Sequence, residues 1–254
     1  MRISAESGAF STTTKNNLSS YGLDNVPTKN NLSSYGLDNV DCDICQNRGY
    51  ILFDDAERGL TARECTCMAS RRSLRRIKNS NMEDALSRYS FDTYEETDKE
   101  THMVKKKALE FAENPAWFFI GGRSGSGKTH ICTAICGELI RKGYDVRYEL
   151  WRDLTTTLKP IVNDPEYAEK LKRLSAVPVL YIDDLFKGNV TGADLNLAFQ
   201  LINARYNDRR LITILSSELT LSEIIEHDEA LGGRIYERAR GFVLAAPNRN
   251  RRIS

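Results

Sequence analysis

The chain has 254 residues, enough for one sizeable domain and a small second one. Charged residues make up 28% of it and the formal net charge is +1, a balance that by itself requires neither nucleic acid nor a membrane as partner. No apolar run approaches the roughly 20 residues of a membrane span. The N-terminus also lacks the apolar core of a signal peptide, so we expect a cytoplasmic protein.

Residues 1–41 form a polar tail that contains a tandem duplication. The segment TKNNLSSYGLDNV occupies residues 14–26 and recurs identically at residues 28–40. Repeat architectures need at least about three stacked units, so one pair of copies does not predict a solenoid. We expect the tail to be disordered or to act as a short docking peptide.

Residues 42–78 carry four cysteines as C-x₂-C, nineteen residues, then C-x-C: Cys42, Cys45, Cys65 and Cys67. Four thiolates in a tetrahedron are a common structural zinc site, and cysteines of a cytosolic chain rarely form disulfides. Residues 49–53 and 60–64, between the two pairs, are typical of a short hairpin. So small a segment cannot bury enough core alone, so we predict that zinc supplies its folding energy. Unrelated reduced cysteines and an iron–sulfur cluster are the alternatives.

A basic run follows the cysteines, with Arg71, Arg72, Arg75, Arg76 and Lys78 at helical spacing. It predicts either contacts with nucleic-acid phosphates or a solvated helix face. Residues 79–98 are predicted to be a linker, with an ordered, extended piece around Phe91 and Tyr94 at the edge of the next domain. The large domain is then predicted over residues 99–254, beginning with a helix at residues 100–113.

The strongest motif lies at residues 122–129, directly after an apolar run at residues 116–120 that predicts a buried strand. It fits G-x-x-x-x-G-K-[ST], and its members are Gly122, Arg123, Ser124, Gly125, Ser126, Gly127, Lys128 and Thr129. Apolar residues recur at helical spacing after it. Strand, glycine loop and helix N-terminus together form a cradle of backbone N–H groups for phosphates. We expect Lys128 to reach the β- and γ-phosphates of ATP and the Thr129 hydroxyl to bind Mg²⁺.

From this loop onward, predicted strands and helices alternate. The strands are predicted at residues 145–150, 178–183 and 211–217, and the helices at 151–162, 166–174, 195–208 and 222–240. This alternation indicates an α/β fold with a parallel sheet flanked by helices.

The strand over residues 178–183 delivers two acidic side chains to the edge of the sheet. Asp183 is predicted to hold the Mg²⁺ shell and Asp184 to polarise the attacking water as a general base. The next strand also ends in polar residues, which are placed to sense the γ-phosphate through that water.

Four segments, GGRSGSGKT, VLYIDDLF, TILSSELTLSEI and LGGRIYERARGF, resemble in order and spacing the AAA+ ATPases that load the replicative helicase in bacteria and phages (DnaC/DnaI type). The resemblance covers about residues 42–254. The cysteine segment is similar to family members with an N-terminal zinc-binding region. The stretch Phe91-Asp92-Thr93-Tyr94 resembles the segment that leads into their ATPase domain. The resemblance therefore implies an AAA+ P-loop NTPase preceded by a small zinc-binding module.

The resemblance also implies roles for single residues. Ser217 and Glu218 fall at sensor 1, where Glu218 departs from the asparagine of many relatives. Arg234 aligns with the arginine finger that reaches a neighbouring subunit's nucleotide, with Arg238 and Arg240 as competitors. A second sensor is expected among Arg249, Arg251 and Arg252.

Taken together, the motifs and the resemblance imply an ATPase with Mg²⁺ and Zn²⁺ that loads the replicative DNA helicase onto single-stranded DNA at the initiation of replication. Self-association through the AAA+ domain is expected. The first alternative is a transposition-associated, IstB-like AAA+ ATPase that acts on DNA with a transposase. The second is a zinc-binding protein whose ATPase fold serves only as a nucleotide-gated interaction module. Cys132 and Cys136 are expected to be core residues.

Overall fold

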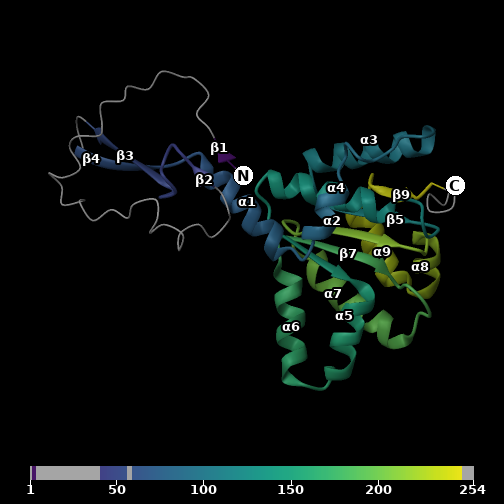
Figure 1. The fold of residues 1–254 in the computed structure, drawn as a ribbon. Coiled ribbons are helices and arrows are strands. Elements are labelled where there is room, and N and C mark those ends of the chain that lie inside the picture. The colour runs from purple at the N-terminus through teal and green to yellow at the C-terminus, as the bar shows by residue number, and fades with distance from the viewer. Residues whose placement is uncertain (1, 4–40, 56–58, 248–254) are drawn as a thin grey trace. The chain divides into compact units, whose positions relative to one another are not determined.

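The computed structural model describes residues 2–3, 41–55 and 59–247. The chain divides into two compact units, Met1–Arg75 and Arg76–Ser254 (Figure 1). The duplication at residues 14–40 and the predicted second sensor at Arg249, Arg251 and Arg252 lie outside the described residues. The predicted boundaries of tail, module, linker and ATPase domain stay a prediction. None of the helices in the described ranges has both the length and the apolar character needed to cross a membrane.

The first unit is built from two small strand pairs and the start of a helix. Strand β1 (Arg2–Ile3) pairs in parallel with β2 (Asp41–Cys42). Strands β3 (Tyr50–Asp55) and β4 (Gly59–Glu64) form an antiparallel hairpin, which confirms the predicted one. Helix α1 (Cys67–Asn79) begins at the last cysteine and contains the basic run, which is helical as predicted.

The second unit is organised around a five-stranded parallel sheet. Its strands are β5 (Trp117–Gly121), β6 (Val146–Leu150), β7 (Val179–Leu185), β8 (Ile212–Ser217) and β9 (Val243–Ala245), in the order β6-β7-β8-β5-β9. The first four confirm the predicted strands. Strand β9 was not predicted; it pairs with β5 over only three residues. Because all five strands are parallel, their carboxyl ends meet at one edge of the sheet.

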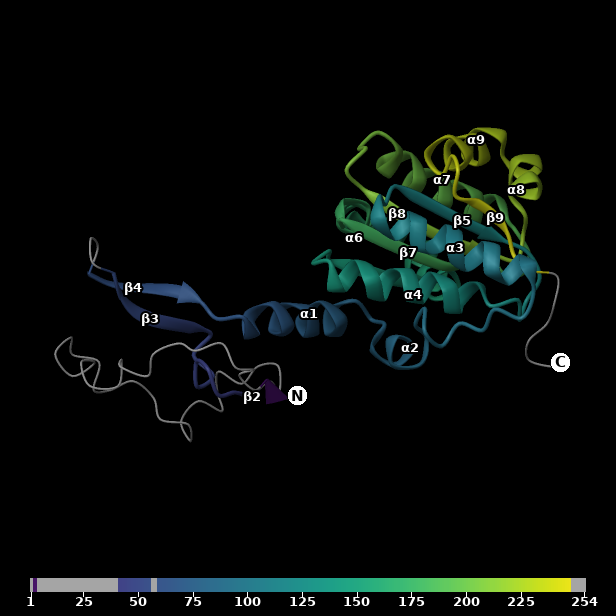
Figure 2. The ribbon, with the colours of Figure 1, turned by 90° about the horizontal axis from the view of Figure 1, so that it is seen from above.

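Helices cover both faces of this sheet, as Figure 2 shows. They are α2 (Glu83–Arg88), α3 (Lys99–Glu113), α4 (Lys128–Arg141), α5 (Trp151–Leu158), the 3₁₀ turn η3 (Lys159–Ile161), α6 (Pro165–Ala176), α7 (Gly192–Tyr206), α8 (Leu221–His227) and α9 (Glu229–Arg238). Helix α2 lies within the predicted linker, where no helix was expected: Met82, just before the helix, is buried and gives it an apolar anchor. The helix predicted at residues 222–240 is divided at Asp228, whose side chain caps α9 by accepting from the Leu231 N–H at 2.9 Å.

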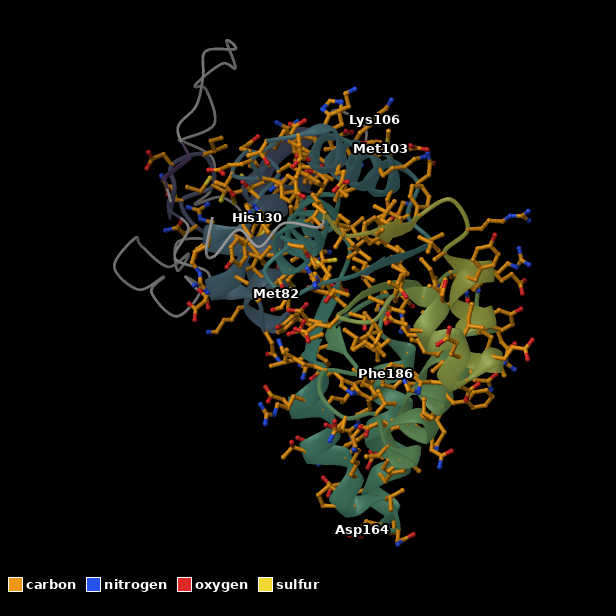
Figure 3. All side chains as sticks on the ribbon, turned by 90° about the vertical axis from the view of Figure 1, so that its right-hand side faces the viewer. Met82, Met103, Lys106, His130, Asp164 and Phe186 are labelled. Atoms are coloured by element: carbon orange, nitrogen blue, oxygen red, sulfur yellow. The ribbon has the colours of Figure 1, made fainter. Side chains whose placement is uncertain are left out.

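Two apolar layers, one on each face, fix the helices to the sheet. Along β5, Trp117 and Phe119 join the layer of α5 to α9, whereas Phe118 and Ile120 join the layer of α3 and α4. Neighbouring strand residues point to opposite faces, so a fully apolar strand fits a sheet that is covered on both sides. Figure 3 places Phe186 inside the unit, where it is 3% exposed, and Met103 and Lys106 at the surface of α3.

Cys132 and Cys136 on α4 are fully buried in the second layer, which confirms the predicted core positions. Burial raises the pKa of both thiols, so they remain protonated and behave as small apolar side chains.

Candidate functional site

The predicted phosphate loop connects β5 to the N-terminus of α4. Gly122, Gly125 and Gly127 have φ angles of 138°, 77° and 90°, a region that side-chain-bearing residues rarely adopt. At Gly121 a Cβ atom would lie 2.4 Å from the Leu219 carbonyl oxygen, so the segment after β8 passes directly against the loop. Helix α4 begins at Lys128, and its free N–H groups and dipole therefore face the loop. This is the arrangement that binds phosphate.

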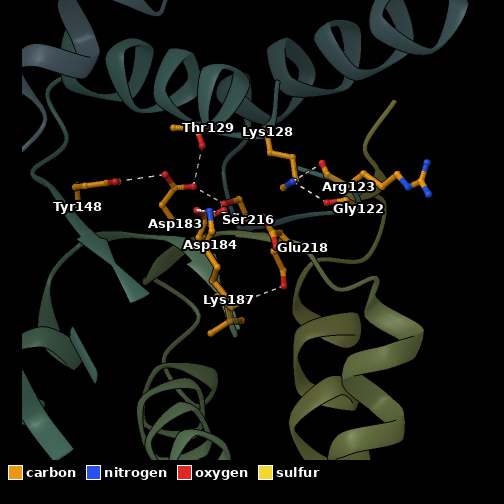
Figure 4. A network of polar contacts seen from close by, with 12 residues as sticks. Gly122, Arg123, Lys128, Thr129, Tyr148, Asp183, Asp184, Lys187, Ser216 and Glu218 are labelled. Carbon is orange, nitrogen blue, oxygen red and sulfur yellow. Dashed lines mark hydrogen bonds and ion pairs between the residues drawn. The ribbon is translucent and has the colours of Figure 1, made fainter. Parts of the chain in front are cut away.

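Lys128 is buried in this loop, with 5% of its surface exposed. Its ammonium donates to the carbonyl oxygens of Gly122 at 2.6 Å and Arg123 at 2.8 Å (Figure 4). Burial lowers the pKa of Lys128, and the negative charges of Asp184, Glu218 and Asp183 oppose that shift. A buried cation within a glycine loop is a strong partner for a phosphate group.

Asp183 is the centre of the site and is 3% exposed. Its Oδ1 accepts hydrogen bonds from Tyr181 at 2.6 Å, from Thr129 at 3.2 Å and from Ser216, and its Oδ2 accepts one from Tyr148 at 3.3 Å. Burial and the charge of Asp183 raise the pKa of both tyrosines, so their hydroxyls stay protonated donors. The Thr129 hydroxyl beside a carboxylate is a set of hard oxygen ligands that fits Mg²⁺.

Strand geometry explains this convergence. Tyr181 lies two residues before Asp183 on β7, and therefore on the same face. Tyr148 is the register partner of Tyr181 on β6, with ring centroids 5.3 Å apart. Thr129 comes from the first turn of α4, and Ser216 comes from β8. Asp183 therefore receives hydroxyl groups from four different elements.

The β7–β8 ladder is irregular just beyond Ile182. Asp184 and Phe186 have φ angles of 54° and 61°, which is strained for residues with side chains. The Asp184 N–H donates to the Ser216 hydroxyl at 2.9 Å, and the Phe186 ring packs edge-on against Trp151. The chain thus leaves the sheet through a fixed turn, which turns two consecutive carboxylates toward the site.

Lys187 and Glu218 complete the polar network in Figure 4. The Lys187 ammonium lies 2.5 Å from Asp184 Oδ2 and 3.5 Å from Glu218 Oε1. The hydrogen bond to Asp184 raises the pKa of Lys187, and burial partly opposes the shift. The second aspartate of the motif is therefore ion-paired.

The two serines at the end of β8 have different partners. The Ser216 hydroxyl contacts Asp183, whereas the fully buried Ser217 donates to the Leu185 carbonyl oxygen at 2.6 Å and accepts from the Leu219 N–H at 3.1 Å. The predicted contact of Ser217 with the nucleotide stays a prediction. Tyr148, Tyr181 and Lys187 were not predicted as members of the site, and Ser216 was expected only as one of the polar residues at the end of its strand. Tyr181 could have been found from the sequence, because it lies two residues before Asp183 on the same strand.

Arg234, the predicted finger, lies on α9. It donates to Asn203 Oδ1 at 3.0 Å and to the Ala230 carbonyl oxygen at 2.8 Å, and its guanidinium lies over the rings of Phe199 and Tyr206. These contacts hold the guanidinium on the α7–α9 surface, and none of them involves the phosphate loop or the two aspartates. The competitor Arg240 is exposed.

The competitor Arg238 is also held within the unit. Its guanidinium donates to the carbonyl oxygens of Tyr206 at 2.5 Å and Asp208 at 3.3 Å and lies over the Trp117 ring.

The four cysteines of the first unit come together as a second candidate site. The sulfur atoms of Cys42, Cys45, Cys65 and Cys67 all lie within 4.8 Å of one another, and all four residues are buried. The Cys42–Cys65 and Cys45–Cys67 pairs are 3.8 Å and 3.5 Å apart. A tetrahedron with zinc–sulfur bonds of about 2.3 Å has edges of about 3.8 Å, so the four thiols fit zinc.

The backbone around the first cysteine pair supports this fit. Gln46, Asn47 and Gly49 have φ angles of 50°, 68° and 81°, and the Gly49 N–H donates to the Cys45 sulfur at 3.3 Å. Burial raises the pKa of Cys45 and raises that of Cys67 to about 12. A metal ion would supply the positive charge that stabilises buried thiolates.

The chain matches known protein families. The sequence profile described as IstB-like ATP binding protein matches residues 49–239. Protein XkdC of the phage-like element PBSX of Bacillus subtilis (strain 168) is 33% identical over 224 residues, which are 80% of this chain and 81% of that protein. The replicative helicase loader DnaC of Escherichia coli (strain K12) is 29% identical over 133 residues, and the match spans 53% of its length.

The solved structures support the fold. A crystal structure of the DnaC helicase loader superposes with a TM-score of 0.56 and 24% identity, covering 64% of this chain and 99% of that one. The profile match spans most of the present chain, so the protein belongs to the family of IstB-like ATP binding proteins. It is an ATPase of the AAA+ class, as the four segments of its sequence predicted.

The cysteine site predicts a structural metal. Metal analysis of the purified full chain should give about one zinc per chain, because four buried thiols at tetrahedral spacing bind one ion. Replacing Cys45 and Cys67 together with alanine should remove the zinc and make residues 41–78 sensitive to protease. The matched control replaces Cys132 and Cys136, which lie outside the cluster, and should keep the zinc. An unchanged zinc content in the Cys45/Cys67 variant would reject the site.

Proposed function

We propose that this IstB-like ATP binding protein is an ATP-dependent loader that places the replicative DNA helicase on single-stranded DNA when replication begins. The observation that carries the proposal is the four-cysteine cluster in the unit that precedes the ATPase sheet. A small module of this kind, held together by a metal, offers a surface for a protein partner that is separate from the nucleotide site. The similarity to a replicative helicase loader over about half of the chain supports the same reading.

In this proposal the loop over residues 122–129 binds the phosphates of ATP. Lys128 exchanges its carbonyl partners for the β- and γ-phosphates, and Thr129 and Asp183 would hold Mg²⁺, which would neutralise phosphate charge. Asp184 accepts a proton from the attacking water as the water oxygen bonds to the γ-phosphorus and the bond from that phosphorus to the leaving ADP oxygen breaks. Arg234 stabilises the negative charge of the transition state in a neighbouring subunit, so self-association through the ATPase domain is part of the mechanism.

The proposed partner surfaces follow from the order of the units. The zinc module binds the helicase, and the ATPase domain contacts single-stranded DNA when ATP is bound. The chain's net charge is only +1, so we expect DNA contact to be weak, sensitive to salt and dependent on assembly.

The second candidate is a transposition-associated ATPase that acts on DNA with a transposase. The family's description, IstB-like, favours it. Both candidates use the same nucleotide site, and they differ in the protein that the chain binds.

The nucleotide site predicts two distinct defects. Lys128→Ala should weaken ATP binding by about 100-fold, because two charge-assisted contacts of about 1.5 kcal/mol each are lost. Asp184→Asn should keep ATP binding and lower turnover by about 100-fold, the usual contribution of a general base. Calorimetry and phosphate release measure the two effects. Normal turnover by the Lys128→Ala protein would contradict the assignment.

If Arg234 is the arginine finger, two inactive variants should complement each other in a mixed assembly. Arg234→Ala should bind ATP yet fail to hydrolyse it, and mixing it with Lys128→Ala protein should restore part of the activity. The first variant contributes an intact nucleotide site and the second an intact finger. Arg173→Ala, which removes an exposed arginine paired with Glu169 on α6, is the control and should stay active alone. If the mixed subunits assemble but stay inactive, Arg234 is not the arginine finger, and Arg238 is the next candidate.

The partner is tested with the full chain as bait. We expect it to retain the host's purified replicative helicase. The variant with Cys45 and Cys67 replaced by alanine should lose the helicase, whereas the Cys132/Cys136 control should retain it. Binding that is unaffected by loss of the cluster would contradict the role of the module. Binding of a transposase in place of the helicase would establish the second candidate.

A further inference from the structure

Lys187 is a cation at the nucleotide site for which the proposed chemistry provides no use. Its ammonium lies between the carboxylates of Asp184 and Glu218, at 2.5 Å from the first and 3.5 Å from the second. In Figure 4 it lies on the side of both carboxylates away from Lys128 and Thr129. Lys187 is therefore placed to act on the carboxylates and not on the phosphates.

The turn that carries Lys187 is fixed at its base. The Lys187 N–H donates to the Asp184 carbonyl oxygen at 3.0 Å, and Phe186 between them is buried against Trp151. The backbone of the turn is thus anchored, whereas the lysine side chain itself is 42% exposed. Movement of the ammonium between its two acceptors needs only rotations within the side chain.

The ion pair constrains the residue that is proposed to receive the proton. Asp184 has only 18% of its side chain exposed and a strained φ angle of 54°. The ammonium bonded to Oδ2 holds the Asp184 carboxylate toward Lys187, on the side away from Lys128 and Thr129, and takes up one of the lone pairs of that oxygen. As long as this pair exists, the carboxylate is oriented toward the lysine and not toward a water molecule near the phosphate loop.

Glu218 provides the alternative acceptor, and its backbone is coupled to the phosphate loop. It directly follows Ser217, whose carbonyl oxygen accepts from the Gly122 N–H at 3.1 Å. The close approach of Gly121 to Leu219 fixes the segment on its other side. A shift of the loop around bound phosphates therefore also moves Glu218 relative to Lys187.

We propose that Lys187 is a positioning residue that restrains ATP hydrolysis by holding Asp184, and that Glu218 releases Asp184 by taking over the lysine. This proposal rests on the proposed role of Asp184 as general base. It gives Glu218 a function that runs through Lys187 and not directly through the attacking water.

The first test is Lys187→Met in the full chain, which removes the ammonium and keeps most of the aliphatic part of the side chain. The expected result is a rise in kcat of about three- to tenfold, as when a competent state populated at about 10–30% becomes the only one. The KM for ATP should stay within about twofold, because the phosphate loop is untouched. The matched control is Lys170→Met on α6, which breaks an exposed pair with Glu166 and should change neither constant. An unchanged or lower kcat for Lys187→Met would overturn the proposal.

The second test separates the two roles of Glu218. Glu218→Gln should lower kcat, because the lysine then stays on Asp184. The double variant Lys187→Met/Glu218→Gln should have the raised kcat of Lys187→Met. If the double variant stays as slow as Glu218→Gln, Glu218 acts directly on the water and the proposal is wrong.

A third variant distinguishes failure of the proposed role of Lys187 from failure of the proposed role of Asp184 as general base. Adding Asp184→Asn to Lys187→Met should abolish the gain in turnover. Full turnover in that variant would show that Asp184 is not the base, which refutes the proposed chemistry itself and the restraint with it.

Discussion

The ATPase unit depends on one buried carboxylate, that of Asp183. A buried charge is costly unless hydrogen bonds satisfy it, and here the donors are the hydroxyls of Thr129, Tyr148, Tyr181 and Ser216. These side chains come from the helix after the phosphate loop and from three adjacent strands. Satisfying Asp183 therefore fixes the loop, the strand register and the edge of the sheet against one another. The same carboxylate and the Thr129 hydroxyl form the pair of hard ligands that fits a magnesium ion, so the contact that orders the site also prepares it for nucleotide.

Local signals made much of this site predictable from the sequence. The phosphate loop and strands β5 to β8 were predicted because their signals, runs of apolar residues and closely spaced glycines, are contained in short stretches of sequence. Strand β9 and helix α2 were missed because three and six residues carry too little pattern, and tertiary contacts decide their structure. Tyr148 and Ser216 were not predicted to contact Asp183, for another reason. They reach Asp183 through the register of parallel strands, which depends on how the strands pack and not on sequence neighbours. The sensor role that the resemblance implies for Ser217 stays a prediction; in the structure its hydroxyl is bonded to Leu185, and Ser216 contacts the aspartate.

In the proposed mechanism, the groups that bind nucleotide and the lysine that restrains hydrolysis lie on different sides of the acidic pair. Lys128 and the loop backbone lie on one side of the acidic pair, and Lys187 lies on the other (Figure 4). A protein that must hold ATP until a partner is in place benefits from such a division, because tight binding and slow turnover then depend on different residues. The metal-fitting cysteine cluster lies in a different unit, so the proposed contact with a protein partner involves other residues than the nucleotide site does. The cluster was predictable because its four cysteines lie in two close pairs, whereas the pairing of Lys187 with Asp184 needed coordinates.

The central claim is that Asp183, held by its four hydroxyl donors, binds the magnesium ion that accompanies the nucleotide. The most direct test is calorimetric measurement of ATP binding with magnesium and with EDTA, in the wild-type chain and in Asp183→Asn. We predict that magnesium tightens binding to the wild type and has no effect on Asp183→Asn, whose affinity should equal that of the wild type in EDTA. If Asp183→Asn keeps the full magnesium dependence, the carboxylate does not hold the ion and the account is wrong.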